Sequence, residues 1–293
     1  MKLITFLAII ISSLVGKTAP PSHQETITRS LQFSETSADN ELWLRNIQGD
    51  VTVIGYQGET VEISAEKTIE ARTQERVQLG VEEIQLTAKL DSNIMLVYMD
   101  APFIDAQRKG NHFHYRTDHH HGDWNQPKYN YRMDFTVRIP KTLILKVSTI
   151  NEGTVTIENV QSPRIEARNV NGPIQATDIS GQTSAVTVNG DVDISFAKAP
   201  AEDSHFKTIN GDITLLMPES LSADISFKSM NGEFYTNFEQ IDYLPAEVSS
   251  DRRKGSKRTT YRIDRSTKIR IGQGGPTVET ETLNGEVYLK SNE

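Results

Sequence analysis

The stretch Ile209-Asn210-Gly211-Asp212-Ile213-Thr214-Leu215 decides the expected fold of this chain. An apolar residue precedes Asn-Gly, one further residue follows, and an apolar–x–apolar alternation completes the string. Five other segments repeat it or a close variant: 150–157 (with one extra residue), 170–174, 188–194, 230–234 and 283–289. The glycines of the first five copies recur at nearly constant spacing, at positions 153, 172, 190, 211 and 232. A nearly fixed period of this length is typical of repeat architectures.

Two all-β architectures can use this repeat. Asn-Gly favours a type I′ hairpin turn, which predicts an antiparallel meander. A meander gives no reason for the same string to return at every second turn, whereas a solenoid stacks equivalent positions of successive coils. Weaker turn signals lie about halfway between the Asn-Gly sites, at 159–163, 178–181 and 217–220. The sequence therefore favours a single-stranded β-solenoid, or β-helix-like stack, with coils of about 20 residues.

The repeated Asn and Gly residues are interpreted as structural corners of this solenoid. Asn side chains at a corner can stack as a ladder, and Gly supplies a left-handed backbone. The expected corner residues are Asn151, Asn171, Gly172, Asn189, Gly190, Asn210, Gly211, Asn231, Gly232, Asn284 and Gly285. The last repeat is expected to close the stack.

Alternating apolar residues mark further strands before the repeats. They lie at 42–47, 51–54, 60–65, 83–88, 93–98 and 131–139. The one helical candidate, 66–79, lacks a clear apolar stripe. We therefore expect an N-terminal β region over 25–140 and β-solenoid repeats over 141–293, with a basic insertion over 237–268.

The segment 1–19 is expected to be a secretory signal peptide. A short basic start precedes an almost wholly apolar run over 3–15, which is too short to span a bilayer comfortably, and small residues follow before Pro20-Pro21. An N-terminal membrane anchor is the competing interpretation. We expect no transmembrane segment in the mature chain and a location in the periplasm or at the surface of a bacterium.

The composition narrows the range of partners. Removing Lys2 and Lys17 changes the formal charge from −8 to −10, since 29 of the 31 basic residues then oppose 39 acidic ones. An acidic chain binds nucleic acid poorly, because phosphate neutralisation supplies most of the affinity, so no nucleic-acid partner is expected. The chain has no cysteine, and its stability must therefore come from burial and backbone pairing rather than disulfides.

Three groups of segments together resemble a known family. They are 45–56 with 61–67, 135–141 with 145–151, and 271–276 with 281–287. In this order they resemble the DUF4097 family of bacterial envelope domains, described as putative adhesins. The resemblance covers roughly residues 40–290. It implies an all-β, solenoid-like domain exported to the envelope, and it carries over no catalytic residue.

A histidine cluster is the first candidate binding site. Five of the seven histidines lie within ten residues. Imidazole is a common transition-metal ligand, and four alternating positions are the candidate metal ligands: His112, His114, His119 and His121. The surrounding segment 107–128 also contains Gly, Asn and Pro and bridges two strands. This favours a solvated hairpin tip, with surface binding of zinc, copper or nickel as the alternative.

Other charged features favour structural interpretations. The basic run at 252–258 is typical of a solvated loop, with contact to anionic lipid or acidic polysaccharide as the alternative. Asp191 and Asp193 could act as the acid and base of a polysaccharide-active enzyme, but no Arg, Lys or His recurs beside them. Four carboxylates that follow corner glycines would solubilise the column or bind Ca²⁺: Asp191, Asp212, Glu233 and Glu286.

These observations favour an exported, non-enzymatic protein that presents a rigid repeat surface for interactions at the bacterial cell envelope. No cofactor is expected, and the partner is an envelope protein or a glycan. A periplasmic metal-binding protein acting through 107–128 is the first alternative. A polysaccharide-active β-helix enzyme is the second.

Overall fold

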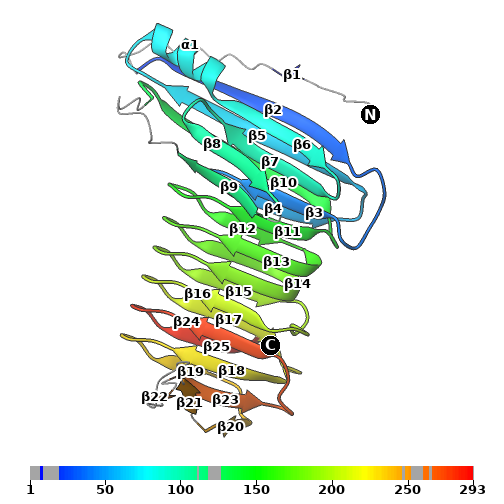
Figure 1. The fold of residues 1–293 in the computed structure, drawn as a ribbon, viewed down its shortest axis with the longest axis vertical. Helices are drawn as coiled ribbons and strands as arrows, with labels where there is room; N and C mark the ends of the chain where they lie inside the picture. The colour runs from blue at the N-terminus through cyan, green and yellow to red at the C-terminus, as the bar shows by residue number, and fades with distance from the viewer. Residues whose placement is uncertain are drawn as a thin grey trace.

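A column of stacked β-coils makes up most of the molecule, with a broader N-terminal end and the C-terminal strand near the opposite end (Figure 1). The computed structural model describes residues 7–8, 20–110, 112–117, 127–245, 248–251, 260–263 and 266–292. Nearly all regular structure is β, and the coils pair in parallel. The expectation of an all-β, solenoid-like fold is therefore confirmed, and the meander is wrong.

The elements are named in chain order. The N-terminal part contains β1 (Leu7–Ala8), β2 (Ser22–Gln32), β3 (Glu41–Arg45), β4 (Val51–Tyr56), β5 (Thr60–Glu70), α1 (Gln74–Glu83), β6 (Gln85–Asp91), β7 (Ile94–Asp100), β8 (Ile104–Lys109), β9 (His112–Thr117) and β10 (Asn130–Pro140). The first coils that follow contain β11 (Ile144–Ser148), β12 (Val155–Glu158), β13 (Gln161–Arg168), β14 (Ile174–Val186), β15 (Val192–Phe196), β16 (Ser204–Lys207) and β17 (Ile213–Pro218). The remaining strands are β18 (Ala223–Lys228), β19 (Phe234–Thr236), β20 (Ile241–Tyr243), β21 (Val248–Asp251), β22 (Thr260–Ile263), β23 (Thr267–Ile271), β24 (Thr277–Glu281) and β25 (Val287–Asn292).

Two sheets face each other along the column. Sheet A has the order β1-β2-β5-β10-β4-β12-β14-β15-β17-β25-β19. Sheet B has the order β6-β7-β3-β11-β13-β14-β16-β24-β18-β23-β20. The long strand β14 bends from one sheet to the other, with Asp178 and Gly181 at positive φ.

The core lies between the sheets and follows from the period-2 alternation of the strands. Equivalent apolar residues of successive coils stack on one another. In sheet A this gives a column of fully buried side chains: Val155, Ile174, Val192, Ile213 and Val287. Because every coil contributes one such residue, the burial that stabilises one coil depends on its two neighbours.

Coil stacking begins before residue 141. β3 pairs in parallel with β11, and β4 pairs in parallel with β12, so Val51 lies beside Val155. The corner of this first coil is Gln48-Gly49, and Gln48 forms a parallel bridge with Asn151. The division into domains at residue 141 stays a prediction, while the stacking itself crosses that position.

The last repeat of the sequence does not close the stack, so this prediction was wrong. β25 lies between β17 and β19, and β24 lies between β16 and β18. The C-terminal coil is therefore inserted between two coils that precede it in the chain (Figure 1). The end of the column is formed by β18 and β19, and β23 with β20 extends sheet B antiparallel to β18.

The N-terminal end is built from antiparallel strands and α1. β5 pairs with β2 on one side and with β10 on the other. The predicted helix at 66–79 was misplaced, because β5 continues to Glu70 and the helix begins after Thr73, whose hydroxyl accepts a hydrogen bond from the Arg76 amide. The buried Lys67 ties the parts together, since it pairs with Glu25 at 2.6 Å and donates to the carbonyls that end α1.

The predicted signal peptide over 1–19 lies outside the described residues, apart from β1. Leu7 and Ala8 of this strand pair antiparallel with Ile27 and Thr26 of β2. Among the described residues, no helix has the length and apolar character needed to cross a bilayer.

Candidate functional site

Each corner begins with a small polar residue that lies just before the apolar residue of the repeat. Thr208 is buried, and its hydroxyl donates to the Gly190 carbonyl of the adjacent coil at 2.8 Å. The same bond recurs along the column: Thr149 to Gly49, Asn169 to Gly153, Thr187 to Gly172 and Thr282 to Gly211. A buried carbonyl without a partner is costly, so these five side chains explain how their corners close. At the corner before Met230, the buried Ser229 hydroxyl has no hydrogen-bond partner among the described residues.

The corner glycines are needed because the coils approach closely there. A Cβ built on Gly172 would lie 2.1 Å from the Gly153 oxygen, and one on Gly153 would lie 1.9 Å from the Gly49 oxygen. Neither Gly153 nor Gly172 has a left-handed backbone, whereas Gly211 has φ +152°. Left-handed conformation alone therefore does not account for the corner glycines, because the carbonyl of the neighbouring coil excludes a side chain even where φ is ordinary.

The corner asparagines form a continuous ladder of side-chain amides. Asn210 donates to Asn189 at 2.8 Å and accepts from Asn284 at 2.8 Å. The other rungs join Asn171 to Asn151, Asn189 to Asn171 and Asn231 to Asn284. The structure thus places the expected corner residues together on one edge of the column. Their mutual bonds hold each side chain in a fixed orientation.

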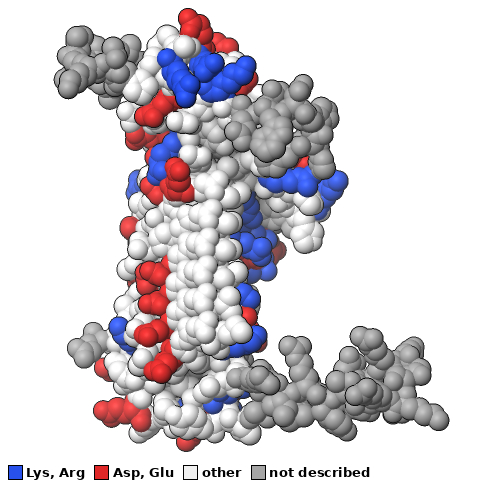
Figure 2. All heavy atoms as spheres, turned by 90° about the vertical axis from the view of Figure 1, so that its left-hand side faces the viewer, with Lys and Arg blue, Asp and Glu red and all other residues white. Residues whose placement is uncertain are grey.

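A row of aliphatic side chains runs beside the amide ladder. It consists of the residue before each corner Asn: Ile150, Val170, Val188, Ile209, Leu283 and Met230. Val170 is 37% exposed, Leu283 40% and Met230 76%. We call the aliphatic row and the amide ladder together the corner face. Figure 2 shows a long uncharged band on this side of the column, with acidic side chains along one margin and basic ones along the other.

The acidic margin contains the carboxylates expected from the sequence. Asp191 accepts a hydrogen bond from the Asp212 amide at 2.9 Å, and Asp212 accepts one from the Glu286 amide at 2.8 Å. These oxygens therefore bind the backbone of the adjacent coil. Burial raises the pKa of Asp193, the neighbouring charges of Asp191 and Asp212 raise it further, and a hydrogen bond with Thr214 opposes them.

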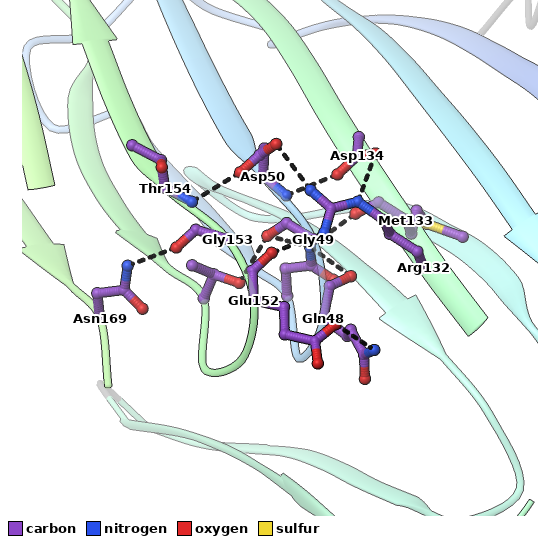
Figure 3. A network of polar contacts seen from close by, with 12 residues as sticks. Gln48, Gly49, Asp50, Arg132, Met133, Asp134, Glu152, Gly153, Thr154 and Asn169 are labelled. Atoms are coloured by element: carbon purple, nitrogen blue, oxygen red, sulfur yellow. Dashed lines mark hydrogen bonds and ion pairs between the residues drawn. The ribbon is translucent and has the colours of Figure 1, made fainter. Parts of the chain in front are cut away.

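The negative charge of the acidic margin is paired with a cation at the N-terminal end of the column but not toward the C-terminal end, among the residues that the structure describes. At the first corner, Arg132 of β10 bonds to Asp50 at 2.7 Å, to Asp134 at 2.9 Å and to the Glu152 carbonyl at 2.7 Å (Figure 3). Burial works against the charge of Arg132, but its carboxylate partners raise its pKa overall. In the part of the chain that the structure describes, no ion pair forms at Asp191, Asp193, Asp212 or Glu286. Negative charge thus accumulates toward the C-terminal end of the column.

The basic margin lies on the outer face of sheet B, two residues before the aliphatic row. Lys207 and Lys228 both pair with Glu281, at 3.0 and 3.4 Å. The hydrogen bond with Lys207 lowers the pKa of Glu281 against the effect of burial. Arg168 is exposed on the same row. The basic run at 252–258 lies outside the described residues.

The candidate metal ligands are only partly described. His112 and His114 lie on β9 with exposed side chains on one strand face, while Phe113 and Tyr115 face the aromatic cluster over Trp43. His119 and His121 fall outside the described residues. Within the described ranges, no group of three or more metal-ligating side chains is gathered at one place. The metal site therefore stays a prediction.

Sequence reasoning missed two parts of the corner. The Thr, Ser or Asn before each apolar residue could have been recognised as part of the repeat, since one of them precedes every copy. The role of Arg132 could not be predicted, because nothing in its local sequence shows that β10 lies against the first corner. Arg132 and its partner Asp50 are 82 residues apart in the chain.

Residues 134–268 match the family model described as Toastrack DUF4097. Three solved structures are reported as similar: a putative cell adhesion protein from Clostridium sporogenes ATCC 15579 (11% identity, TM-score 0.38, covering 92% of this chain and 100% of that one), a putative adhesin from Bacteroides fragilis NCTC 9343 (12%, 0.39, 92% and 97%) and a putative lipid binding protein from Parabacteroides distasonis ATCC 8503 (11%, 0.29, 92% and 97%). No curated protein matches the chain. The resemblance drawn from the sequence is confirmed: over residues 134–268, which hold five of the Asn corners, this chain matches the Toastrack DUF4097 family.

Proposed function

We propose that this chain is an exported, non-enzymatic, adhesin-like binding protein of the bacterial cell envelope, and that the corner face is its contact surface. The observation that carries the proposal is the aliphatic row beside the amide ladder, in which Val170, Leu283 and Met230 are exposed and the other three members are half-buried. The row lies on the side of the column where Figure 2 shows an uncharged band. Soluble proteins rarely leave a long apolar row exposed, and such surfaces commonly mark interaction sites.

The structure of the corner suits a binding surface. The amide ladder and the Thr-to-Gly bonds fix the corner side chains before any partner arrives, so little side-chain entropy is lost on contact. Burying the exposed parts of the aliphatic residues then supplies a favourable free energy of about 25 cal/mol for each Å² of apolar surface. The amides keep donors and acceptors for an envelope protein or a glycan.

The non-enzymatic assignment rests on how the carboxylates are used. Asp191, the first member of the acid–base pair considered from the sequence, accepts a hydrogen bond from the adjacent coil. Corner carboxylates of this kind hold neighbouring coils together. The match to the Toastrack DUF4097 model supports the same interpretation.

A pair of matched substitutions tests the corner face. Leu283 on this face and Leu79 on α1 are both 40% exposed. We expect Leu283→Asp to weaken binding of the purified protein to isolated cell envelopes by about tenfold in a sedimentation assay, because an exposed apolar contact is replaced by a charge. Leu79→Asp should leave binding unchanged. Equal binding by wild type and Leu283→Asp, with circular dichroism showing an intact fold, would contradict the proposal.

A further inference from the structure

One row on the outer face of sheet B has an arginine on either side of a serine. Arg45 of β3 lies beside Ser148 of β11, and Ser148 lies beside Arg168 of β13, in parallel register. Neighbouring strands are about 4.8 Å apart, so the Cα atoms of the two arginines are roughly 10 Å apart. We call these three residues the arginine row. The small side chain of Ser148 leaves room between the two longer ones.

The two arginines lack the counter-charges that neighbouring cations have. The other Lys and Arg residues of this face on β11, β13, β16 and β18 each pair with a carboxylate: Lys146 and Arg164 with Glu41, and Lys207 and Lys228 with Glu281. Among the residues that the structure describes, neither Arg45 nor Arg168 forms an ion pair. The charge of Glu166 favours the charged form of Arg45, but its carboxylate lies 3.8 Å from Arg164.

Arg45 is half-buried beside the hairpin that β8 and β9 form. Its cross-strand neighbour Tyr98 contacts Tyr115 of β9, with 5.8 Å between the ring centroids. Burial, together with the charge of Arg168, lowers the pKa of Arg45 to about 10, so the side chain stays cationic at neutral pH. Tyr115 supplies no counter-charge, because burial raises its pKa and its hydroxyl donates to the Met99 carbonyl at 2.6 Å. A half-buried cation without a partner is costly, and a bound anion would remove that cost.

The hydrogen-bond donors of the arginine row also lack acceptors. A guanidinium group carries five N–H donors. That of Arg45 makes one long bond, to the Leu44 carbonyl at 3.4 Å. Within the described part of the chain, the Arg168 guanidinium and the Ser148 hydroxyl donate to no acceptor. Donors from three adjacent strands therefore lie along one row with almost no acceptor of their own.

We propose that the arginine row binds a phosphate group between Arg45 and Arg168, with the Ser148 hydroxyl as a third donor. Guanidinium groups bind phosphate through pairs of N–H···O bonds. A phosphate ester carries close to two negative charges at neutral pH and three acceptor oxygens that point in different directions. It therefore matches two cations and three donor groups. A carboxylate has one charge and two oxygens in one plane, and would leave part of this set unpaired.

This site is separate from the corner face. On two coils its residues stand two positions before the aliphatic row, Ser148 before Ile150 and Arg168 before Val170. They belong to the basic margin, and Figure 2 shows basic side chains along that side of the uncharged band. Phosphate binding here does not require the corner face to be a contact surface, so each proposal can fail without the other.

Calorimetric titration of the purified protein with inorganic phosphate, at constant ionic strength, tests the site. We expect saturable binding that Arg168→Gln weakens by at least about tenfold. Lys207→Gln is the matched control, because it removes the same charge from the same margin while Glu281 keeps Lys228 as its partner. It should leave the affinity for phosphate unchanged, and acetate should bind far more weakly than phosphate. The absence of heat with phosphate would overturn the proposal, as would equal losses in the two variants or equal affinities for acetate and phosphate.

A carboxylate placed between the two arginines gives a second, independent measurement. Ser148→Glu should abolish phosphate binding and raise the melting temperature, because the new side chain supplies the missing counter-charge to both neighbours. Ser148→Gln has nearly the same shape without the charge and should be less stable than Ser148→Glu. If Ser148→Glu has the lower melting temperature of the two, the arginines are not unpaired cations and the proposal is wrong.

Vesicles distinguish the two sources of the phosphate group. Suppose the protein sediments with vesicles of equimolar phosphatidic acid and phosphatidylcholine, Arg168→Gln does not, and Lys207→Gln still does. The site then takes the phosphate of a lipid headgroup. Heat with inorganic phosphate but no sedimentation would assign the site to free phosphate or a soluble phosphate ester. Vesicle binding that ignores Arg168→Gln, with no heat from inorganic phosphate, would overturn the proposal.

Discussion

Replacing Gly153 by alanine tests the close contact between coils that shapes each corner. The new Cβ would lie 1.9 Å from the Gly49 oxygen, whereas ordinary contact begins at 3.4 Å, so the first two coils must move apart at this corner. Three hydrogen bonds span this contact: Thr149 to Gly49 at 2.9 Å, Gly49 to Asn151 at 3.2 Å and Val51 to Thr154 at 2.9 Å. A separation large enough to admit the methyl group breaks all three.

At about 1 kcal/mol for each bond, their loss destabilises the protein by about 3 kcal/mol. For a chain of this size, this corresponds to a fall in the melting temperature of roughly 6–12 °C, which thermal unfolding followed by circular dichroism measures directly. Gly110→Ala is the control, because Gly110 has φ +59° but no atom of the described residues within 4 Å of the added Cβ. It should cost only the left-handed strain of about 1–2 kcal/mol. An effect of Gly153→Ala no larger than that of Gly110→Ala would refute the reasoning.

The corner and the histidine strand carry three further predictions. Thr208→Val removes the buried donor to the Gly190 carbonyl and should lower the free energy of unfolding by about 1–2 kcal/mol. Asn210→Ala should lower it less, because water can replace the hydrogen bonds of the exposed amide. Urea denaturation measures both values, and a larger loss for Asn210→Ala would contradict this account of the corner. Burial and Asp191 raise the pKa of Asp193 in the fold, so its carboxylate form opposes folding: its stabilising contribution is complete below the ordinary aspartate pKa and is lost as the pH rises through the raised value. Asp193→Asn should therefore be more stable than wild type at pH 7, with the difference vanishing in acid, and a difference independent of pH would disprove the assignment. If β9 binds metal, calorimetric titration with Zn²⁺ should release heat that a His112→Ala/His114→Ala variant reduces and a His205→Ala control retains; no heat from the unmodified protein would exclude the metal hypothesis.

The coil architecture was predictable because both residues of Asn-Gly are required at the same place. The glycine leaves room for the carbonyl of the neighbouring coil, as Gly172 does for the Gly153 carbonyl, and the asparagine hydrogen-bonds within the amide ladder. These two constraints repeat with each coil and leave a period in the sequence. The first coil was missed because Gln48 replaces asparagine there, although Gly49 and the following strand keep the pattern.

Long-range order was not predictable from local patterns. The repeat 283–289 has the same residues whether it closes the column or enters it, and only its pairing with both β17 and β19 places it. Asn284 bonds to Asn210 and to Asn231, which are separated from it by 74 and 53 residues. β2 was overlooked because its alternation is mostly polar, with Ile27 as its one well-buried apolar residue.

The most direct test of the central claim is oxidative footprinting of Met230 with and without isolated cell envelopes. Met230 lies on the corner face and is 76% exposed, while Tyr243 lies outside it on β20 and is 77% exposed. Both side chains are readily oxidised by hydroxyl radicals, and mass spectrometry can follow each one separately. If the corner face is the contact surface, envelopes should protect Met230 and leave the oxidation of Tyr243 unchanged. Equal oxidation of Met230 in both samples, under conditions where the protein sediments with the envelopes, would contradict the account.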